Sequence, residues 1–246
     1  MIKSLLILGG TGDAFNLAQM LAKERPKLRV ITSLAGRTDQ PRLPAGEVRR
    51  GGFGGPEGLC AYLVAEGIGA MVDATHPFAA QISSHAVTAA SQAALPLVRL
   101  DRQPWTPEAG DIWVEAQNLE EASELLPQGA RVFLTVGRQE LAAFSHRSDC
   151  WFLVRLVDAP QEPLPFGRYE VVLGRGPYRL KEETALLAHH GLEVLVTKNS
   201  GGVAASAKLM AARHAGLPVV MVARPHLPAC NSVTSLEAIL PWLDQI

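Results

Sequence analysis

The chain has 246 residues, of which 48% are hydrophobic and 19% are charged, and its formal net charge is -1. This length leaves room for one large or two small domains with a buried core, and the composition is typical of a globular protein rather than a disordered one. A net charge so close to zero gives no general attraction to nucleic acid or to an anionic membrane. Recognition of any anion must therefore depend on local clusters of cations.

The three cysteines, Cys60, Cys150 and Cys230, lie far apart and form neither a CxxC motif nor a spacing typical of metal ligands. Scattered cysteines in apolar surroundings are typical of reduced thiols, so we expect no bound metal. No apolar segment approaches the roughly 20 residues that a membrane-spanning helix needs. The N-terminal apolar stretch is too short for a secretion signal. The sequence therefore predicts a cytoplasmic protein with no membrane or nucleic-acid partner.

Short β-branched apolar segments alternate along the chain with longer segments of helical periodicity, a pattern that predicts βα units and parallel sheets. In the first hundred residues the expected strands are 5–8, 30–34, 47–50, 70–72 and 95–100, and the expected helices are 13–24, 56–66 and 78–93. Right-handed crossovers between these elements produce a doubly wound sheet.

Periodicity is lost between Asp101 and Asp111, where two prolines and a glycine indicate a linker. Beyond it the expected strands are 132–136, 152–157, 170–173, 192–197 and 219–223, and the expected helices are 119–126, 139–144, 179–189, 203–214 and 236–243. We therefore predict an α/β fold of two Rossmann-like domains, with parallel sheets flanked by helices and an active site in the cleft between them. Residues 1–100 would form the first domain, residues 101–110 the linker, and residues 111–246 the second domain.

A glycine-rich turn directly follows the first expected strand, with Gly9, Gly10, Thr11 and Gly12 in succession. Glycines at a strand-to-helix turn let the backbone approach a pyrophosphate, and the helix that follows offers unpaired N–H groups and a partial positive charge. The third glycine of the full dinucleotide fingerprint is replaced by Phe15. A plain tight turn is the alternative, but the position between strand and helix favours phosphate binding.

The residues after the second expected strand favour NADP over NAD. An NAD site usually places an acidic residue there to bind the ribose 2′-hydroxyl, whereas the first acid in this segment is Asp39. Ser33 and Arg37 are present instead, and a guanidinium group can bind phosphate oxygens through two parallel hydrogen bonds. The alternative is that Arg37 is an ordinary surface residue.

Two further segments are expected to contact the cofactor. Gly52, Phe53 and Gly54 belong to a run of four glycines around one aromatic ring, which suits the close passage of a flat ligand. A flexible loop with Phe53 in the core is the alternative. Thr75 and His76 follow the fourth expected strand, with Thr75 as the expected cap of the next helix, where the dipole disfavours a charged imidazole. A neutral His76 that donates to the cofactor is thus favoured over His76 as proton donor, with a structural histidine as the alternative.

Four expected strands of the second half end in the same way, with an apolar run followed by a cation. These cations are Arg138, Arg175, Lys198 and Arg224. Ligands of open α/β sheets bind outside the carboxyl ends of the strands, and parallel strands bring those ends to one edge. The pattern therefore predicts a site for a ligand with several negative charges, unless each cation is merely solvated or caps a helix elsewhere. Asn199 and Ser200 are expected to add hydrogen-bond donors to this site.

Together these motifs resemble those of one enzyme family. The stretches GGTGDA, SLAGRT, GGFGG, DATHPFA, TVGRQEL, RGP and KNSGG occur in this order over nearly the whole chain. They are similar to the motifs of the precorrin-6A reductases of cobalamin (vitamin B12) biosynthesis. The resemblance implies a two-domain reductase that uses NADPH to reduce one double bond of precorrin-6A, which gives precorrin-6B.

The resemblance also implies a tetrapyrrole substrate fringed with carboxylates, and neighbouring enzymes of the same pathway as the protein partners to consider. It places eleven residues on the cofactor side: Gly9, Gly10, Thr11, Gly12, Ser33, Arg37, Gly52, Phe53, Gly54, Thr75 and His76. The substrate side rests on our own placement of Arg138, Arg175, Lys198, Asn199, Ser200 and Arg224.

The sequence assigns no catalytic residue. Hydride transfer depends mainly on holding the nicotinamide against an electrophilic carbon, and the cofactor supplies the chemistry. His76, Tyr178 and solvent are all candidates for the proton donor. A non-catalytic NADP-binding sensor and a cobalt-precorrin-6A reductase stay open as alternatives. An atypical short-chain dehydrogenase is disfavoured, because none of the three tyrosines has a lysine four residues later.

Overall fold

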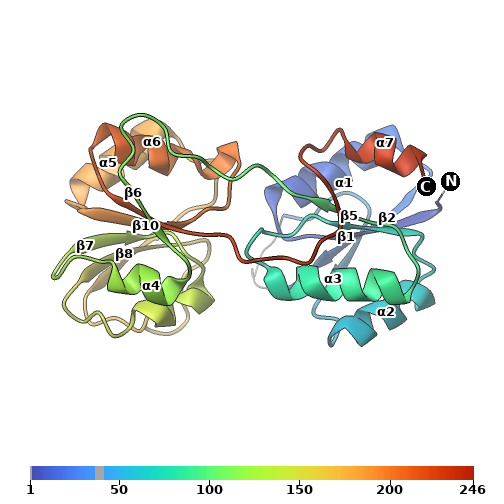
Figure 1. Cartoon of the computed structure of the whole chain (residues 1–246), viewed down its shortest axis with the longest axis horizontal. Coiled ribbons are helices and arrows are strands. Elements are labelled where there is room, and N and C mark those ends of the chain that lie inside the picture. Colours follow the sequence, from blue (N-terminus) through green and yellow to red (C-terminus); the bar gives the residue numbers. More distant parts are fainter. Residues whose placement is uncertain (1, 37–41) are drawn as a thin grey trace. The chain divides into compact units, whose positions relative to one another are not determined.

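The computed structural model describes residues 2–36 and 42–246, and the chain divides into two compact units (Figure 1). Unit 1 comprises Met1–Gln103 and Pro225–Ile246, and unit 2 comprises Pro104–Arg224. Each unit holds a six-stranded sheet with helices on both faces, and every strand pairing within the described residues is parallel. The prediction of an α/β fold with two Rossmann-like units is confirmed.

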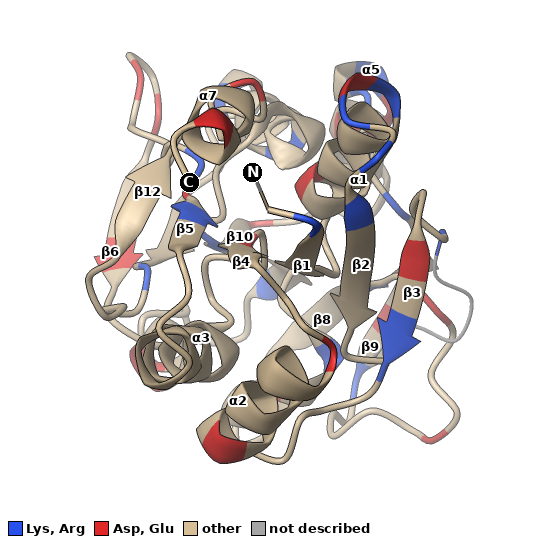
Figure 2. Ribbon diagram, turned by 90° about the vertical axis from the view of Figure 1, so that its right-hand side faces the viewer, with Lys and Arg blue, Asp and Glu red and all other residues tan. Residues whose placement is uncertain are grey.

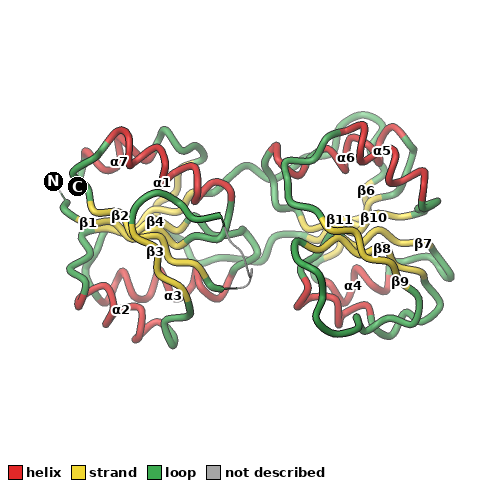
Figure 3. Tube along the Cα trace, turned by 180° about the vertical axis from the view of Figure 1, so that it is seen from behind, coloured by secondary structure: helices red, strands yellow, loops and turns green. Residues whose placement is uncertain are grey.

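Unit 1 has the strand order β12-β5-β4-β1-β2-β3, which is that of a doubly wound dinucleotide-binding sheet. Its strands are β1 (Ser4–Leu8), β2 (Arg29–Leu34), β3 (Glu47–Arg50), β4 (Ala70–Asp73), β5 (Leu97–Leu100) and β12 (Asn231–Val233). Its helices are α1 (Gly12–Glu24), α2 (Pro56–Ala65), α3 (Ala80–Gln92) and α7 (Ile239–Asp244). Helices α1 and α7 cover one face of the sheet, and α2 and α3 cover the other (Figure 3).

The central position of β1 explains its sequence. All five residues of Ser4–Leu8 are buried, because β1 lies between β2 and β4 and helices cover both of its sides. A strand buried on both faces is a continuous apolar run rather than an alternating one. Helix α1 instead buries one stripe, with Ala14, Leu17, Ala18 and Leu21 at helical spacing. These patterns are what made both elements predictable.

Unit 2 has the strand order β6-β11-β10-β7-β8-β9. Its strands are β6 (Trp113–Ala116), β7 (Arg131–Leu134), β8 (Trp151–Leu156), β9 (Tyr169–Leu173), β10 (Val194–Lys198) and β11 (Val219–Val222). Its helices are α4 (Leu119–Glu124), α5 (Leu180–His189) and α6 (Ala207–His214), together with the 3₁₀ turns η1 (Arg138–Phe144) and η2 (Val203–Ala205). Helices α5 and α6 lie on one face of the sheet and α4 on the other (Figure 3).

The domain boundaries differ from the expected ranges 1–100, 101–110 and 111–246. Unit 1 continues to Gln103 and also includes the C-terminal segment Pro225–Ile246. The expected second domain, 111–246, therefore includes a segment that belongs to unit 1. Strand β12 pairs with β5, and α7 packs into the core of unit 1. The sequence carried no signal of this return, because β12 is three residues long and its first two side chains are exposed.

Three elements of unit 2 also differ from expectation. Strand β6 was not expected, because its middle residues, Val114 and Glu115, are both exposed and the strand has no apolar run. The expected helix 139–144 is the 3₁₀ turn η1. The expected helix 203–214 begins only at Ala207, because Gly202, with a φ of 81°, leads first into the short turn η2.

None of the helices in residues 2–36 and 42–246 is long and apolar enough to cross a membrane. Within the same residues, no group of three or more His, Cys, Asp or Glu side chains is placed to hold a metal ion.

Candidate functional site

The glycine-rich turn of unit 1 joins β1 to α1 and is held by Thr11. The Thr11 hydroxyl donates to the carbonyl of Ala74 at 2.8 Å and accepts from the N–H of Ala14 at 3.1 Å, so it caps α1 and ties it to the end of β4. A Cβ atom at Gly12 would meet no described atom within 4 Å. The described residues therefore leave room beside Gly12, at the N-terminus of α1, for a ligand atom.

Gly9 has a different role from Gly12. A Cβ atom at Gly9 would lie 2.8 Å from Cγ2 of Thr32, and the Gly9 N–H donates to the carbonyl of Ser33 at 2.9 Å. Gly9 is therefore required by the close packing of β1 against β2. Gly10 has a φ of 102°, a conformation that favours glycine, and a Cβ atom there would meet no atom of the described residues within 4 Å.

At the ends of β2 and β3, Ser33 contacts a cation, Arg49, that no sequence motif indicated. Arg49 donates to the Ser33 hydroxyl at 3.3 Å and to the carbonyls of Gly51 and Gly52 at 2.6 Å each. Its guanidinium carbon lies 3.7 Å from the centroid of the Phe53 ring. Ser33, Gly52 and Phe53 are therefore gathered around one arginine. The register of β2 with β3 pairs Ser33 with Arg49 and explains the contact.

Arginine residues lie toward the carboxyl ends of β3 and β5 in unit 1, where the ribbon is blue (Figure 2). Arg37, expected to bind a 2′-phosphate, lies outside the described residues. Arg42 places its guanidinium carbon 3.7 Å from the ring centroid of Phe15, the residue that replaces the third glycine of the fingerprint. The large side chain at this position thus supports a cation beside the first turn of α1.

The end of β4 holds a polar network around Asp73, whose side chain is 1% exposed. The Asp73 carboxylate accepts from the N–H of Thr75 at 3.2 Å and from its hydroxyl at 2.6 Å, and it pairs with Arg99 of β5 at 3.2 Å. The expectation that Thr75 caps a helix is wrong, because α3 begins only at Ala80. Thr75 instead fixes the loop after β4 by its bonds to Asp73.

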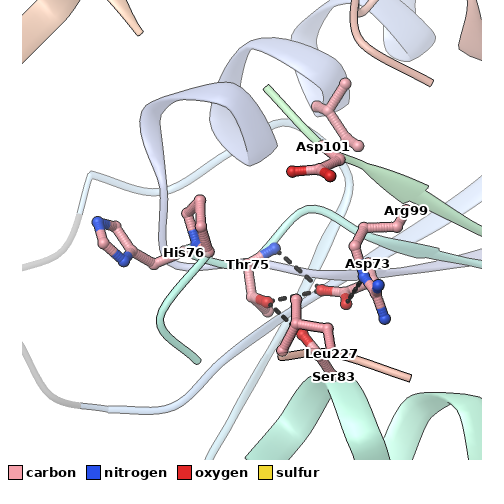
Figure 4. A pocket seen from close by; sticks show the side chains of 9 residues that line it. Asp73, Thr75, His76, Ser83, Arg99, Asp101 and Leu227 are labelled. Atoms are coloured by element: carbon pink, nitrogen blue, oxygen red, sulfur yellow. Dashed lines mark hydrogen bonds and ion pairs between the residues drawn. The ribbon is translucent and has the colours of Figure 1, made fainter. Parts of the chain in front are cut away.

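His76 lies in the same loop, beside a small recess that Asp73, Thr75, Arg99 and Leu227 also line (Figure 4). Its Nδ1 accepts from the N–H of Phe78 at 3.3 Å. Because α3 starts at Ala80, the expected dipole effect on His76 loses its basis. Leu227 belongs to the C-terminal segment Pro225–Ile246 of unit 1, which was expected to be part of the second domain.

Of the four expected cations of unit 2, Lys198 is the last residue of β10, and Arg138, Arg175 and Arg224 follow β7, β9 and β11. All four therefore lie toward the carboxyl edge of one parallel sheet, but they differ in their partners. Arg138 and Arg175 are exposed, and neither forms an ion pair within the described part of the chain. Lys198 is 13% exposed and pairs with both carboxylate oxygens of Glu140 at 2.8 Å. Arg224 donates to the carbonyls of Asn199 at 2.8 Å and Ser200 at 3.3 Å.

The side chain of Asn199 is already engaged within unit 2. Its oxygen accepts from the N–H of Trp105 at 2.8 Å, and its amide donates to the carbonyl of Trp105 at 3.0 Å. The Trp105 indole donates to the carbonyl of Gly202 at 3.0 Å. Asn199 therefore fastens the segment that enters unit 2 to the loop after β10, and a substrate would compete with Trp105 for it. The Ser200 hydroxyl lies 3.4 Å from the carbonyl of Lys198.

Beneath this edge lie buried charges that no sequence motif indicated. Arg155 of β8 and Glu183 of α5 form a pair at 2.7 Å, with side chains 9% and 3% exposed. Lys208 of α6 is 6% exposed, and its amine donates to the Thr135 hydroxyl at 3.0 Å. Burial, and then repulsion from Arg155, lowers the pKa of Lys208 to about 7. Burial also raises the pKa of Tyr178, whose hydroxyl donates to the carbonyl of Gly174 at 3.0 Å.

The chain is similar over nearly its whole length to one family of known proteins. A model of the family described as Precorrin-6x reductase CbiJ/CobK matches residues 4–244. The precorrin-6A reductase of Rhodococcus erythropolis is 48% identical over 244 residues, which cover 98% of each chain. The cobalt-precorrin-6A reductase of Priestia megaterium is 28% identical over 254 residues, which cover 96% of each. A solved structure titled CobK precorrin-6A reductase superposes with a TM-score of 0.95 and 44% identity, covering 99% of this chain and 96% of that one.

Proposed function

The chain belongs to the precorrin-6x reductase CbiJ/CobK family, and from this we propose that it uses NADPH to reduce one double bond of precorrin-6A to precorrin-6B, a step of cobalamin biosynthesis. Besides the similarity to this family, one observation of the structure supports the proposal. Unit 1 has an open glycine-rich turn at the carboxyl ends of its parallel strands, and unit 2 has four cations at the carboxyl ends of its own.

The cofactor side has features that suit a dinucleotide. In the order β3-β2-β1-β4-β5, ligands bind where the strand order reverses, between β1 and β4. The Thr11 bond to Ala74 spans this point, and the first turn of α1 offers its N–H groups to the pyrophosphate. Ser33, Arg37 and Arg49 would then receive the adenosine end with its 2′-phosphate. NADPH would supply the hydride.

The loop after β4 would receive the nicotinamide end. Thr75 and His76 follow β4, on the opposite side of β1 from Ser33. The bonds of Thr75 to the buried Asp73 hold this loop in one conformation. A fixed loop is what hydride transfer requires, because the reacting carbons must be held about 3–3.5 Å apart.

The substrate side would bind the carboxylates of the macrocycle, with the exposed Arg138 and Arg175 as the readiest contacts. A proton must also reach the reduced ring. Tyr178 is disfavoured as its source, because burial raises its pKa and its hydroxyl already donates to Gly174. His76 and solvent remain the candidates. The identity of 48% with a precorrin-6A reductase, against 28% with a cobalt-precorrin-6A reductase, favours the metal-free macrocycle.

The direct test is to incubate the purified protein with precorrin-6A and NADPH. We expect the absorbance of NADPH to fall and mass spectrometry to find a product heavier by two hydrogen atoms. A folded protein that neither oxidises NADPH nor changes the mass of precorrin-6A would refute the proposal.

A charge test addresses the substrate side. Two exposed charge contacts of about 0.7 kcal/mol each, within the range of about 0.2–1 kcal/mol for such pairs, amount to a roughly tenfold rise in KM for precorrin-6A. We expect this rise in the double variant Arg138→Gln, Arg175→Gln, with KM for NADPH unchanged. Lys23→Gln is the control, because Lys23 is 85% exposed in the last turn of α1, at the opposite end of its unit's strands. An unchanged KM in the double variant would remove these arginines from the substrate site.

A further inference from the structure

The carboxyl edge of unit 2 exposes apolar side chains as well as cations. Val157, Leu173 and Val203 have 47%, 54% and 90% of their surface exposed. Val157 directly follows β8, Leu173 is the last residue of β9, and Val203 opens η2 in the connection after β10. Burying an apolar side chain is favourable, so the fold of unit 2 gains little from these three residues where they are.

Backbone hydrogen bonds bring the three segments together. The N–H of Gly174 donates to the carbonyl of Leu156 at 2.9 Å, which joins the end of β9 to the end of β8. The N–H of Tyr178 donates to the carbonyl of Ala204 at 3.1 Å, which joins the segment after Arg175 to η2. A Cβ atom at Gly176 would lie 3.0 Å from the same Ala204 oxygen, so these two segments are in close contact.

Cations and apolar residues both occur along this edge. Arg138 follows β7, Val157 follows β8, and Leu173 and Arg175 lie at the end of β9, beside the turn that holds Val203. The remaining exposed large apolar residues of the described chain, such as Val64 of α2 and Leu125 after α4, belong to other parts of the two units. An exposed apolar patch bordered by charge is typical of a binding surface.

We infer that Val157, Leu173 and Val203 form an apolar contact surface for the ring of a polycarboxylate tetrapyrrole, whose peripheral carboxylates are received by Arg138 and Arg175. The inference rests on the proposed function and adds to it the residues that contact the ring itself. A tetrapyrrole is apolar across its conjugated faces and anionic around its rim, and the edge has the complementary pattern. Ligand sites in general combine an apolar lining with a few placed polar groups.

Two substitutions of opposite charge at Val203 distinguish apolar packing of the ring against this residue from a purely electrostatic effect. If the ring packs against Val203, both Val203→Asp and Val203→Lys place a charge under it, and both should raise KM for precorrin-6A roughly tenfold or more. If only the electric field of the edge matters, Val203→Lys should lower KM while Val203→Asp raises it. KM for NADPH and the melting temperature should stay unchanged in both variants, because the side chain is 90% exposed.

Val64→Asp and Val64→Lys are the matched controls, because Val64 is 68% exposed on α2 of unit 1. We expect wild-type KM for precorrin-6A in both. Opposite effects of Asp and Lys at Val203, or no effect of either, would overturn the inference. So would a wild-type dimer that Val203→Asp converts to monomers without a change in KM, since the edge would then join two copies of this chain.

Binding of uroporphyrin, a polycarboxylate tetrapyrrole, followed by its fluorescence, tests the surface apart from the reaction. We expect both Val203 variants to weaken this binding and both Val64 variants to leave it unchanged. If the wild type binds uroporphyrin in a Val203-dependent way but does not reduce precorrin-6A, the proposed function fails and the surface stands. Normal reduction of precorrin-6A with uroporphyrin binding indifferent to Val203 overturns the surface alone.

Discussion

Lys208 gives the sharpest prediction on stability, because unit 2 buries its amine almost completely. The residue is 6% exposed, and the hydrogen bond recorded for its amine is to the Thr135 hydroxyl at 3.0 Å. Burial is the largest cause that disfavours the ammonium form, Arg155 and Lys198 also repel it, and the attraction of Glu183 does not compensate. The pKa of Lys208 is therefore lowered from 10.5 to about 7.

The cost of this burial follows from the shift. The lowering of the pKa of Lys208 from 10.5 to about 7 corresponds to a destabilisation of the folded state on the order of 5 kcal/mol. The unfolded chain keeps the proton up to 10.5, whereas the folded chain loses it above about 7. Between these values the unfolded state binds more protons, so the free energy of unfolding rises with pH. Below pH 7 both states are protonated and the full cost applies.

Lys208→Met should remove this cost, because Met fills a similar volume without a charge. The lost hydrogen bond to Thr135 offsets about 0.5–1.5 kcal/mol, which leaves a net stabilisation on the order of 4 kcal/mol near neutral pH. Urea unfolding of both proteins from about pH 6 to pH 10 measures the difference, which should shrink by roughly 1.4 kcal/mol per pH unit above pH 7.

The control for this series is Lys23→Met, because Lys23 is 85% exposed. Its difference from the wild type should be small and should not change over the same pH range. A Lys208→Met variant that is less stable than the wild type at every pH, or whose difference is independent of pH, would refute the reasoning.

Three further predictions concern the cofactor side. Gly12→Val should abolish NADP binding in calorimetric titration with an unchanged melting temperature, because its side chain would enter the open space before α1; retained affinity would move the phosphate site elsewhere. Gly9→Ala should lower the free energy of unfolding by about 1–3 kcal/mol, since its Cβ would lie 2.8 Å from Thr32; wild-type stability would contradict that contact. Arg37→Ala should raise KM for NADPH roughly tenfold to a hundredfold with little effect on NADH, and equal losses would mean that Arg37 does not bind the 2′-phosphate.

The sequence predicted the features that depend on neighbouring residues. Strands buried on both faces, such as β1, are continuous apolar runs, and α1 shows its buried stripe at helical spacing. The turn between them was predicted for the same reason, since its glycines act within a few residues of each other, whereas the cap formed by Thr11 appears only in the structure. The parallel direction of the strands followed from the βα alternation, and with it the common edge of Arg138, Arg175, Lys198 and Arg224.

The tertiary structure alone decided which distant segments meet. Strand β12 joins the sheet of unit 1 from the far end of the chain, because its backbone pairs with β5 although its side chains carry no apolar signal. Arg49 reaches Ser33 through the register of β2 and β3, and Lys198 meets Glu140 across the connection after β7.

The hydrogen-bond partners and the burial of a side chain also cannot be inferred from the residues next to it in sequence. The amide of Asn199, which follows a strand as a ligand-binding residue does, is taken by Trp105, and Lys208, on a helix of mixed composition, is buried beneath β7. Local conformation is set by backbone preferences and side-chain periodicity over a few residues. Burial and partner choice depend on strand register and on which helix covers which face, and these are set only when the whole unit packs.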